Sequence, residues 1–190
     1  MIDQNVLPGL IKQFHYYKKL GDQTLGEMKE EELIWQYNDE SNSLAILINH
    51  LSGNMLSRFT GFLNEDGEKT WRNRDAEFAS GPVTRDELLK RWNTGWKCLF
   101  DQLDAMEESD LGTIVYIRNV GHTALEAILR QLAHYAYHVG QMVFIGKMLR
   151  DGEWKSLSIP KGESGQFNQH YFDQPKSIKH FTDDFLRDRE

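Results

Sequence analysis

Residues 123–150, TALEAILRQLAHYAYHVGQMVFIGKMLR, form the stretch that decides the fold. Thr123 and Glu126 have the spacing of a capping box, in which two side chains satisfy free backbone N–H groups at the start of a helix. Apolar residues then recur three and four positions apart, as one face of an α-helix requires. The stretch therefore predicts a long helix that ends near residue 150, where Asp151 and Gly152 follow.

Two histidines of this predicted helix, His134 and His138, lie four positions apart and therefore one turn apart on the same face. At about 100° per residue, this face points away from the middle of the Leu and Val stripe. By this spacing one helix can present two imidazole nitrogens to one metal ion. The residue after His134 is Tyr135 and not Glu, which removes the general base of a zinc metalloprotease and excludes that class. A chance histidine pair without a metal is the alternative.

Three other segments have helical periodicity, namely residues 7–20, 41–62 and 84–103. Ser43 is a suitable N-cap for the second of them. Thr84 and Glu87 form another capping box at the start of the third. Four long helices joined by connections of varied length predict an all-α protein with the architecture of a four-helix bundle.

A short extended segment is predicted before the last long helix, because residues 113–120 are rich in β-branched and aromatic side chains. Asn119-Val120-Gly121 is expected to turn the chain there. We predict that residues 1–150 form the bundle. Residues 151–190 are predicted to be a C-terminal extension that packs on it, with a short helix at 164–172 and a charged, frayed end.

A third histidine, His50, lies in the second predicted helix, away from its apolar stripe and beside small and polar residues. If this face meets the face of His134 and His138, three imidazoles converge. Three protein ligands and one open position are typical of catalytic zinc sites, whereas structural sites have four. A lone histidine on a mostly apolar helix is otherwise a packed or surface residue, and both interpretations remain open from spacing alone.

The charge and composition of the chain limit the kinds of partner that it is expected to bind. The 190 residues carry a net charge of -7, with acidic and basic residues interleaved. A duplex-binding protein concentrates its basic residues on one face, so nucleic acid is excluded as a partner. The acidic balance disfavours anionic membranes, and no apolar stretch reaches the roughly 18 residues of a membrane span. A single cysteine and the lack of a signal-peptide pattern lead us to expect a cytoplasmic protein.

Two motifs resemble the DinB/YfiT-like superfamily. The first is Asn42-Ser43-Leu44-Ala45 leading into Asn49-His50-Leu51, and the second is His134-x-x-x-His138-x-Gly140-Gln141. The stretch at residues 71–78, WRNRDAEF, resembles a branch of that superfamily whose function is unknown. The resemblance implies a four-helix bundle of up-down-down-up topology, often assembled as a homodimer.

The same resemblance implies one divalent metal ion, usually zinc or nickel, held by His50, His134 and His138 with water completing the coordination. Some members of the superfamily are transferases or isomerases that use a low-molecular-weight thiol such as bacillithiol or mycothiol. Metal ligation deprotonates a thiol, which gives such enzymes their nucleophile. We therefore expect a metal-dependent enzyme acting on a small molecule, a thiol S-transferase or a hydrolase. A non-catalytic protein of the stress response that binds a metal or small molecule is the alternative.

Four further side chains are candidates for supporting roles. Gln141 and Asn54 are candidates to orient the ligand histidines by hydrogen bonds. Arg72 and Arg74 lie in the connection between the second and third predicted helices. They either bind an anionic group of a substrate or form surface ion pairs with the nearby Asp75 and Glu77.

Overall fold

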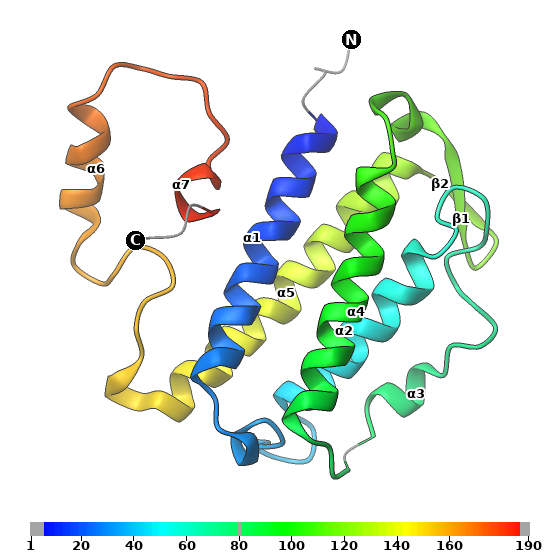
Figure 1. Ribbon diagram of the computed structural model, residues 1–190, viewed down its shortest axis with the longest axis horizontal. Coiled ribbons are helices and arrows are strands. Elements are labelled where there is room, and N and C mark those ends of the chain that lie inside the picture. The colour runs from blue at the N-terminus through cyan, green and yellow to red at the C-terminus, as the bar shows by residue number, and fades with distance from the viewer. Residues whose placement is uncertain (1–5, 80, 187–190) are drawn as a thin grey trace.

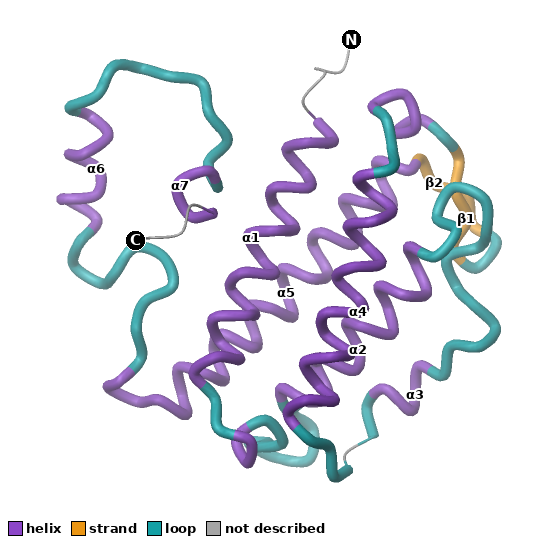
Figure 2. Tube along the Cα trace, viewed as in Figure 1, coloured by secondary structure: helices purple, strands orange, loops and turns teal. Residues whose placement is uncertain are grey.

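Four long helices pack alongside one another at the centre of the molecule (Figure 1). They are α1 (Val6–Glu27), α2 (Leu44–Phe59), α4 (Arg85–Asp104) and α5 (Ala124–Arg150). The computed structural model describes residues 6–79 and 81–186. Within these ranges the chain is mostly helical, with one two-stranded sheet (Figure 2). The prediction of a mainly helical protein is therefore confirmed.

Side-chain caps start three of these helices at the predicted residues. Ser43 accepts a hydrogen bond from the backbone at the start of α2. Thr84 and Glu87 form the complete capping box of α4. Thr123 accepts from the N–H of Glu126 at the start of α5. These contacts satisfy backbone donors that have no partner within a helix, so local sequence alone is enough to place each start.

The first helix runs beyond its predicted end at residue 20 and stops at Glu27. Gly21 is a weak helix former, but here it lets the ring of Trp92 lie directly against the helix, where a Cβ would come within 2.5 Å of the ring. The Trp92 Nε1–H also donates to Asp22 at 2.7 Å. Tertiary packing therefore extends α1. The second helix is shorter than predicted and ends at Phe59, not at residue 62.

An aromatic cluster joins the long helices in the core. Phe14 of α1, Trp96 of α4 and Tyr135 of α5 lie with ring centroids 5.9–6.4 Å apart and are fully buried. Leu51 and Met55 of α2 are also fully buried. Helix α2 packs mainly on α4, and α1 packs on α5. Figure 1 shows α2 and α4 running in one direction, and α1 and α5 running in the opposite one.

The extended segment before α5 is a hairpin and not a single strand. Strand β1 (Ile114–Ile117) pairs antiparallel with β2 (Val120–Thr123). The turn lies at Arg118 and Asn119, which have φ values of 56° and 60°. The prediction of a turn at residues 119–121 is therefore wrong by about one residue. The reason is that Asp66 accepts the backbone N–H groups of Arg118 and Asn119 at 2.9 and 2.7 Å, a contact from a distant loop.

The connection between α2 and α4 contains the short helix α3 (Arg74–Glu77), which packs against α2. The side chain of Asn73 caps it by accepting from the N–H of Ala76 at 3.1 Å. Figure 1 shows this connection passing alongside α2 on the outer side of the four helices. The connection therefore places residues near 72–77 beside the middle of α2.

The C-terminal extension contains α6 (Ser164–Phe172), as predicted, and α7 (Asp183–Leu186). Helix α7 contacts α1, where Lys12 pairs with Asp183 at 2.7 Å and Tyr16 packs on Phe185. Residues 187–190, part of the end expected to fray, lie outside the described residues, and the division into units at residue 150 remains a prediction. No helix in the described part of the chain combines the length and apolar character that crossing a membrane requires.

The α2–α4 contact provides a test of the packing. A Cβ on Gly95 of α4 would lie 2.9 Å from the Cα of Ser52. We expect Gly95→Ala to lower the free energy of unfolding by about 1–3 kcal/mol through overpacking. Gly140→Ala in α5 is the matched control, because its Cβ would meet nothing within 4 Å. It should raise that free energy by up to about 1 kcal/mol. Urea denaturation measures both, and equal effects would contradict the close contact.

Candidate metal centre

Three histidines converge between α2 and α5. His50 comes from α2, while His134 and His138 come from successive turns of α5. Their ring centroids lie 5.1, 5.0 and 4.7 Å apart, and one nitrogen of each lies within 4.8 Å of the others. The structure thus brings together the three residues that the sequence singled out, and the set is able to hold a metal ion.

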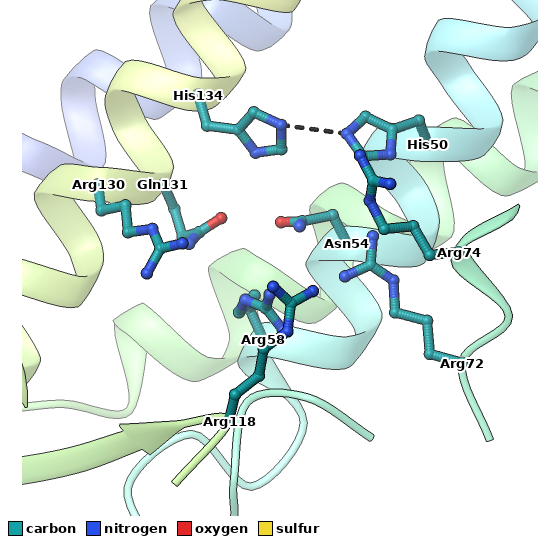
Figure 3. Close-up of a pocket in the computed structure, with 9 residues that line it drawn as sticks. All are labelled: His50, Asn54, Arg58, Arg72, Arg74, Arg118, Arg130, Gln131 and His134. Atoms are coloured by element: carbon teal, nitrogen blue, oxygen red, sulfur yellow. Dashed lines mark hydrogen bonds between the residues drawn. The ribbon is translucent and has the colours of Figure 1, made fainter. Parts of the chain in front are cut away.

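The spacing of two of these nitrogens suits a shared ion. The Nε2 atoms of His50 and His134 lie 3.1 Å apart, as the dashed line in Figure 3 marks. Two nitrogens bound to one tetrahedral zinc, with Zn–N bonds of about 2.0–2.1 Å, lie about 3.3 Å apart. The observed distance is close to the one that a shared ion requires, and the imidazole donor set fits a transition metal such as zinc or nickel.

Hydrogen bonds orient two of the three rings. The Nδ1 of His50 lies 2.9 Å from a carboxylate oxygen of Glu77, and the Nδ1 of His138 lies 2.7 Å from Oε1 of Gln141. Both partners are acceptors, so each Nδ1 carries the proton and donates. This leaves the Nε2 of each ring as the nitrogen that can bind an ion. Metal-binding histidines are commonly oriented in this way by a carboxylate or carbonyl oxygen.

Glu77 is itself held in place by a buried network. Arg72 donates to its two carboxylate oxygens at 2.8 and 2.9 Å, and the Arg72 side chain is only 2% exposed. Burial alone raises the pKa of Glu77, but the hydrogen bonds from Arg72 and His50 outweigh it and keep the pKa below its usual value. Gly53 makes room for the carboxylate, because a Cβ there would lie 2.2 Å from Oε1. The ionised carboxylate therefore reaches His50 only because residue 53 has no side chain.

Burial keeps the histidines of α5 in the form that binds metals. Burial, together with the nearby His138 and His50, lowers the pKa of His134 to about 3. Burial also lowers the pKa of His138, although the hydrogen bond to Gln141 partly opposes this effect. Both rings are consequently neutral at neutral pH, and a neutral imidazole is the ligand that metal ions require.

A cavity of about 370 Å³ adjoins the histidines (Figure 3). His50 and His134 form part of its wall, together with the amides of Asn54 and Gln131. The remaining lining residues are all arginines, namely Arg58, Arg72, Arg74, Arg118 and Arg130. A small molecule in this cavity would therefore lie against the histidine set and among positive charges.

The supporting residues predicted from sequence differ in what they contact in the structure. Gln141 contacts His138, as proposed for an orienting residue. Asn54 lines the cavity, and its side-chain oxygen accepts a hydrogen bond from the hydroxyl of Tyr135 at 2.9 Å. Arg72 and Arg74 both line the cavity, although Arg72 is also committed to Glu77.

Sequence reasoning treated Glu77 as a surface ion-pair residue and missed Arg58, Arg118 and Arg130. A signal for two of the arginines was present. Arg58 follows His50 by eight positions and Arg130 precedes His134 by four, so each shares a helix face with a histidine. Nothing in the local sequence connects Glu77 to His50 or Arg118 to the cavity, because both contacts depend on how connections fold back over the helices.

Fold and site together define a mainly helical protein with a three-histidine set that can hold a metal ion. A family model described as "Protein of unknown function (DUF1572)" matches residues 2–163, and the chain belongs to this family. The matched range includes all four long helices and the three histidines. No curated protein and no solved structure matches the chain.

The orienting role of Glu77 leads to a prediction. We expect Glu77→Gln to weaken zinc binding by about 10- to 100-fold, because His50 loses the carboxylate that fixes its ring and increases its basicity. Asp75→Asn is the matched control in the same short helix, with an exposed side chain, and should bind zinc as the parent does. Competition with a chromogenic chelator measures both affinities.

A second variant keeps this test independent of the charge change. Gly53→Ala retains Glu77 but places a Cβ where the carboxylate lies, so it should also weaken zinc binding. Circular dichroism would establish that each variant is folded. Unchanged affinity in both folded variants would show that Glu77 does not support the histidine set.

Proposed function

We propose that this protein is a DinB/YfiT-like, metal-dependent enzyme that binds one divalent ion, zinc or nickel, through His50, His134 and His138. The observation that carries this proposal is the convergence of three imidazoles beside a cavity of small-molecule size. Three protein ligands leave a coordination position for water or substrate, as in catalytic zinc sites.

The arrangement of the long helices supports the superfamily assignment. The opposite directions of the pair α1 and α5 and the pair α2 and α4 agree with a four-helix bundle of up-down-down-up topology (Figure 1). The long connection through α3 and the packing of α2 on α4 are what such a topology needs, because two consecutive helices that run in the same direction require a return segment.

The proposed reaction is transfer to a low-molecular-weight thiol of the bacillithiol type, or hydrolysis. A bound divalent ion lowers the pKa of a thiol or water that it coordinates and so supplies the nucleophile. The chain contributes orientation and charge. Glu77 and Gln141 fix the ring planes of His50 and His138, and the burial of these two rings limits their access to bulk water.

One observation favours the alternative, a non-catalytic protein that binds a metal or small molecule. Apart from the histidines, the cavity lining within the described residues has only arginines and two amides as polar groups. A carboxylate, thiol or phenol that could transfer a proton at neutral pH is absent from that lining. Catalysis would then depend only on the metal ion and on how the protein positions the substrate.

Homodimer formation is also part of this proposal. Tyr137, Phe144 and Met148 of α5 and Tyr37 of the connection before α2 are exposed apolar or aromatic side chains that line a common groove. Such a surface suits contact with a second copy. Light scattering of the purified full chain would give the mass, and a monomer at all concentrations tested would contradict the proposed dimer.

The metal function is tested by elemental analysis. We expect about one zinc or nickel ion for each chain. His134→Ala should weaken zinc binding by more than about 100-fold, because removing a ligand should cost more affinity than removing a residue that only orients a ligand. His170→Ala, the same change in α6 outside the site, is the control and should bind zinc like the parent. Absence of bound metal, or unchanged affinity in His134→Ala, would contradict the proposal.

Activity separates the enzyme from the binding protein. Metal-loaded protein should accelerate the consumption of an electrophile by one of several low-molecular-weight thiols, or the hydrolysis of an ester or amide, and His134→Ala should lose that acceleration. Inactivity towards all of these substrates in protein that carries a stoichiometric ion would favour the non-catalytic alternative.

A further inference from the structure

The cavity beside the histidines collects arginines from separate parts of the chain. Arg58 comes from α2, Arg72 and Arg74 from the connection that forms α3, Arg118 from the hairpin turn, and Arg130 from α5. Figure 3 shows Arg130 on one side of the cavity and the arginines of the α3 connection on the other. Five cations from four elements do not gather around one space by local sequence pattern, so the fold itself creates this positive site.

Nearby carboxylates neutralise only part of this charge. Glu68 contacts Arg58 and Arg118 at 3.0 Å and Arg72 at 3.7 Å. Glu77 pairs with Arg72 and His50. Three of the five guanidinium groups therefore share these two carboxylates, and the arginines around the cavity outnumber the carboxylates that pair with them. The ion pairs also hold Arg58 and Arg72 in fixed positions before any ligand arrives.

Arg74 and Arg130 are the cations available to a ligand. Within residues 6–79 and 81–186, neither pairs with a carboxylate, and Arg74 lies over the ring of Phe78 at 5.2 Å from its centroid. Arginine presents several N–H donors in a planar fork that matches the oxygens of phosphate and carboxylate groups. These two side chains line the cavity from opposite sides (Figure 3).

Two buried polar atoms of the lining have no hydrogen-bond partner among the described residues. They are Nε of Arg58 and Oε1 of Gln131, in side chains of residues that are 5% and 4% exposed. Buried polar groups in folded proteins are almost always paired, so unpaired ones in a cavity wall point to a ligand. Figure 3 shows the Gln131 oxygen directed into the cavity. Since Oε1 only accepts, a ligand there would carry an O–H or N–H donor.

We propose that the cavity binds the substrate of the metal site through a compact, doubly charged oxygen anion, either a phosphoryl group or paired carboxylates, held between Arg74 and Arg130. A hydroxyl or amino group of the same molecule donates to Gln131. The inference rests on the proposed function, because it assigns a substrate class to that site. A volume of about 370 Å³ suits a small metabolite.

Calorimetric titration of the full-length chain with inorganic phosphate, succinate and acetate tests this assignment. Phosphate or succinate should bind at least about tenfold more tightly than singly charged acetate, and the tighter of the two identifies the anion type. Arg74→Gln and Arg130→Gln should each weaken that binding by about tenfold, since each removes a charge-assisted hydrogen bond. Lys147→Gln, which removes an exposed charge of α5 outside the cavity, should change it by less than about twofold.

Titrations of zinc-loaded and metal-free protein separate failure of this inference from failure of the proposed function. Phosphate or succinate affinity that is equal to acetate affinity, or unchanged in both arginine variants, overturns the anion site. Anion binding that needs zinc but is equally tight in both arginine variants also overturns the anion site, because the metal ion alone then holds the ligand. If the histidines bind no metal while arginine-dependent anion binding persists, the metal function fails and the anion site stands.

Discussion

The buried carboxylate of Glu77 is the interaction on which the site depends. It bridges a guanidinium group and an imidazole inside the protein, where each partner alone would be costly to bury. Together they form a network in which Arg72 keeps Glu77 ionised and Glu77 keeps the proton on Nδ1 of His50. The network also ties the α3 connection to α2, since Gly53 leaves the space into which the carboxylate fits.

A buried ion pair of this kind is weak support for stability, because desolvation offsets much of its attraction. The role of the ion pair here is to fix the orientation of the histidine rings. The hydrogen bond to Nδ1 selects the tautomer of His50, and Gln141 does the same for His138. Both rings then direct Nε2 towards a shared point. The apolar core around Tyr135 supports this arrangement from the other side, because it fixes the helix turn that carries His134.

Charge divides the site into two parts with different tasks. The histidines present ring nitrogens, so they bind a cation by coordination. The arginines around the cavity repel a cation but attract an anion. A ligand with oxygen anions at one end and a nucleophile or electrophile at the other would satisfy both parts. This pairing agrees with an enzyme that positions a small anionic substrate beside a metal ion, which is the function proposed for this protein.

Helix periodicity by itself determined that His134 and His138 share a face, because residues four apart on a helix are neighbours whatever the rest of the chain does. Capping residues likewise set the starts of α2, α4 and α5, since those hydrogen bonds are local. Tertiary structure alone decided that His50 meets this face, that Glu77 reaches His50 across 27 positions of sequence, and that Arg118 lines the cavity. Those contacts arise from packing α2 against α5 and from connections folding back over the helices, and neither process leaves a periodic signal in the sequence.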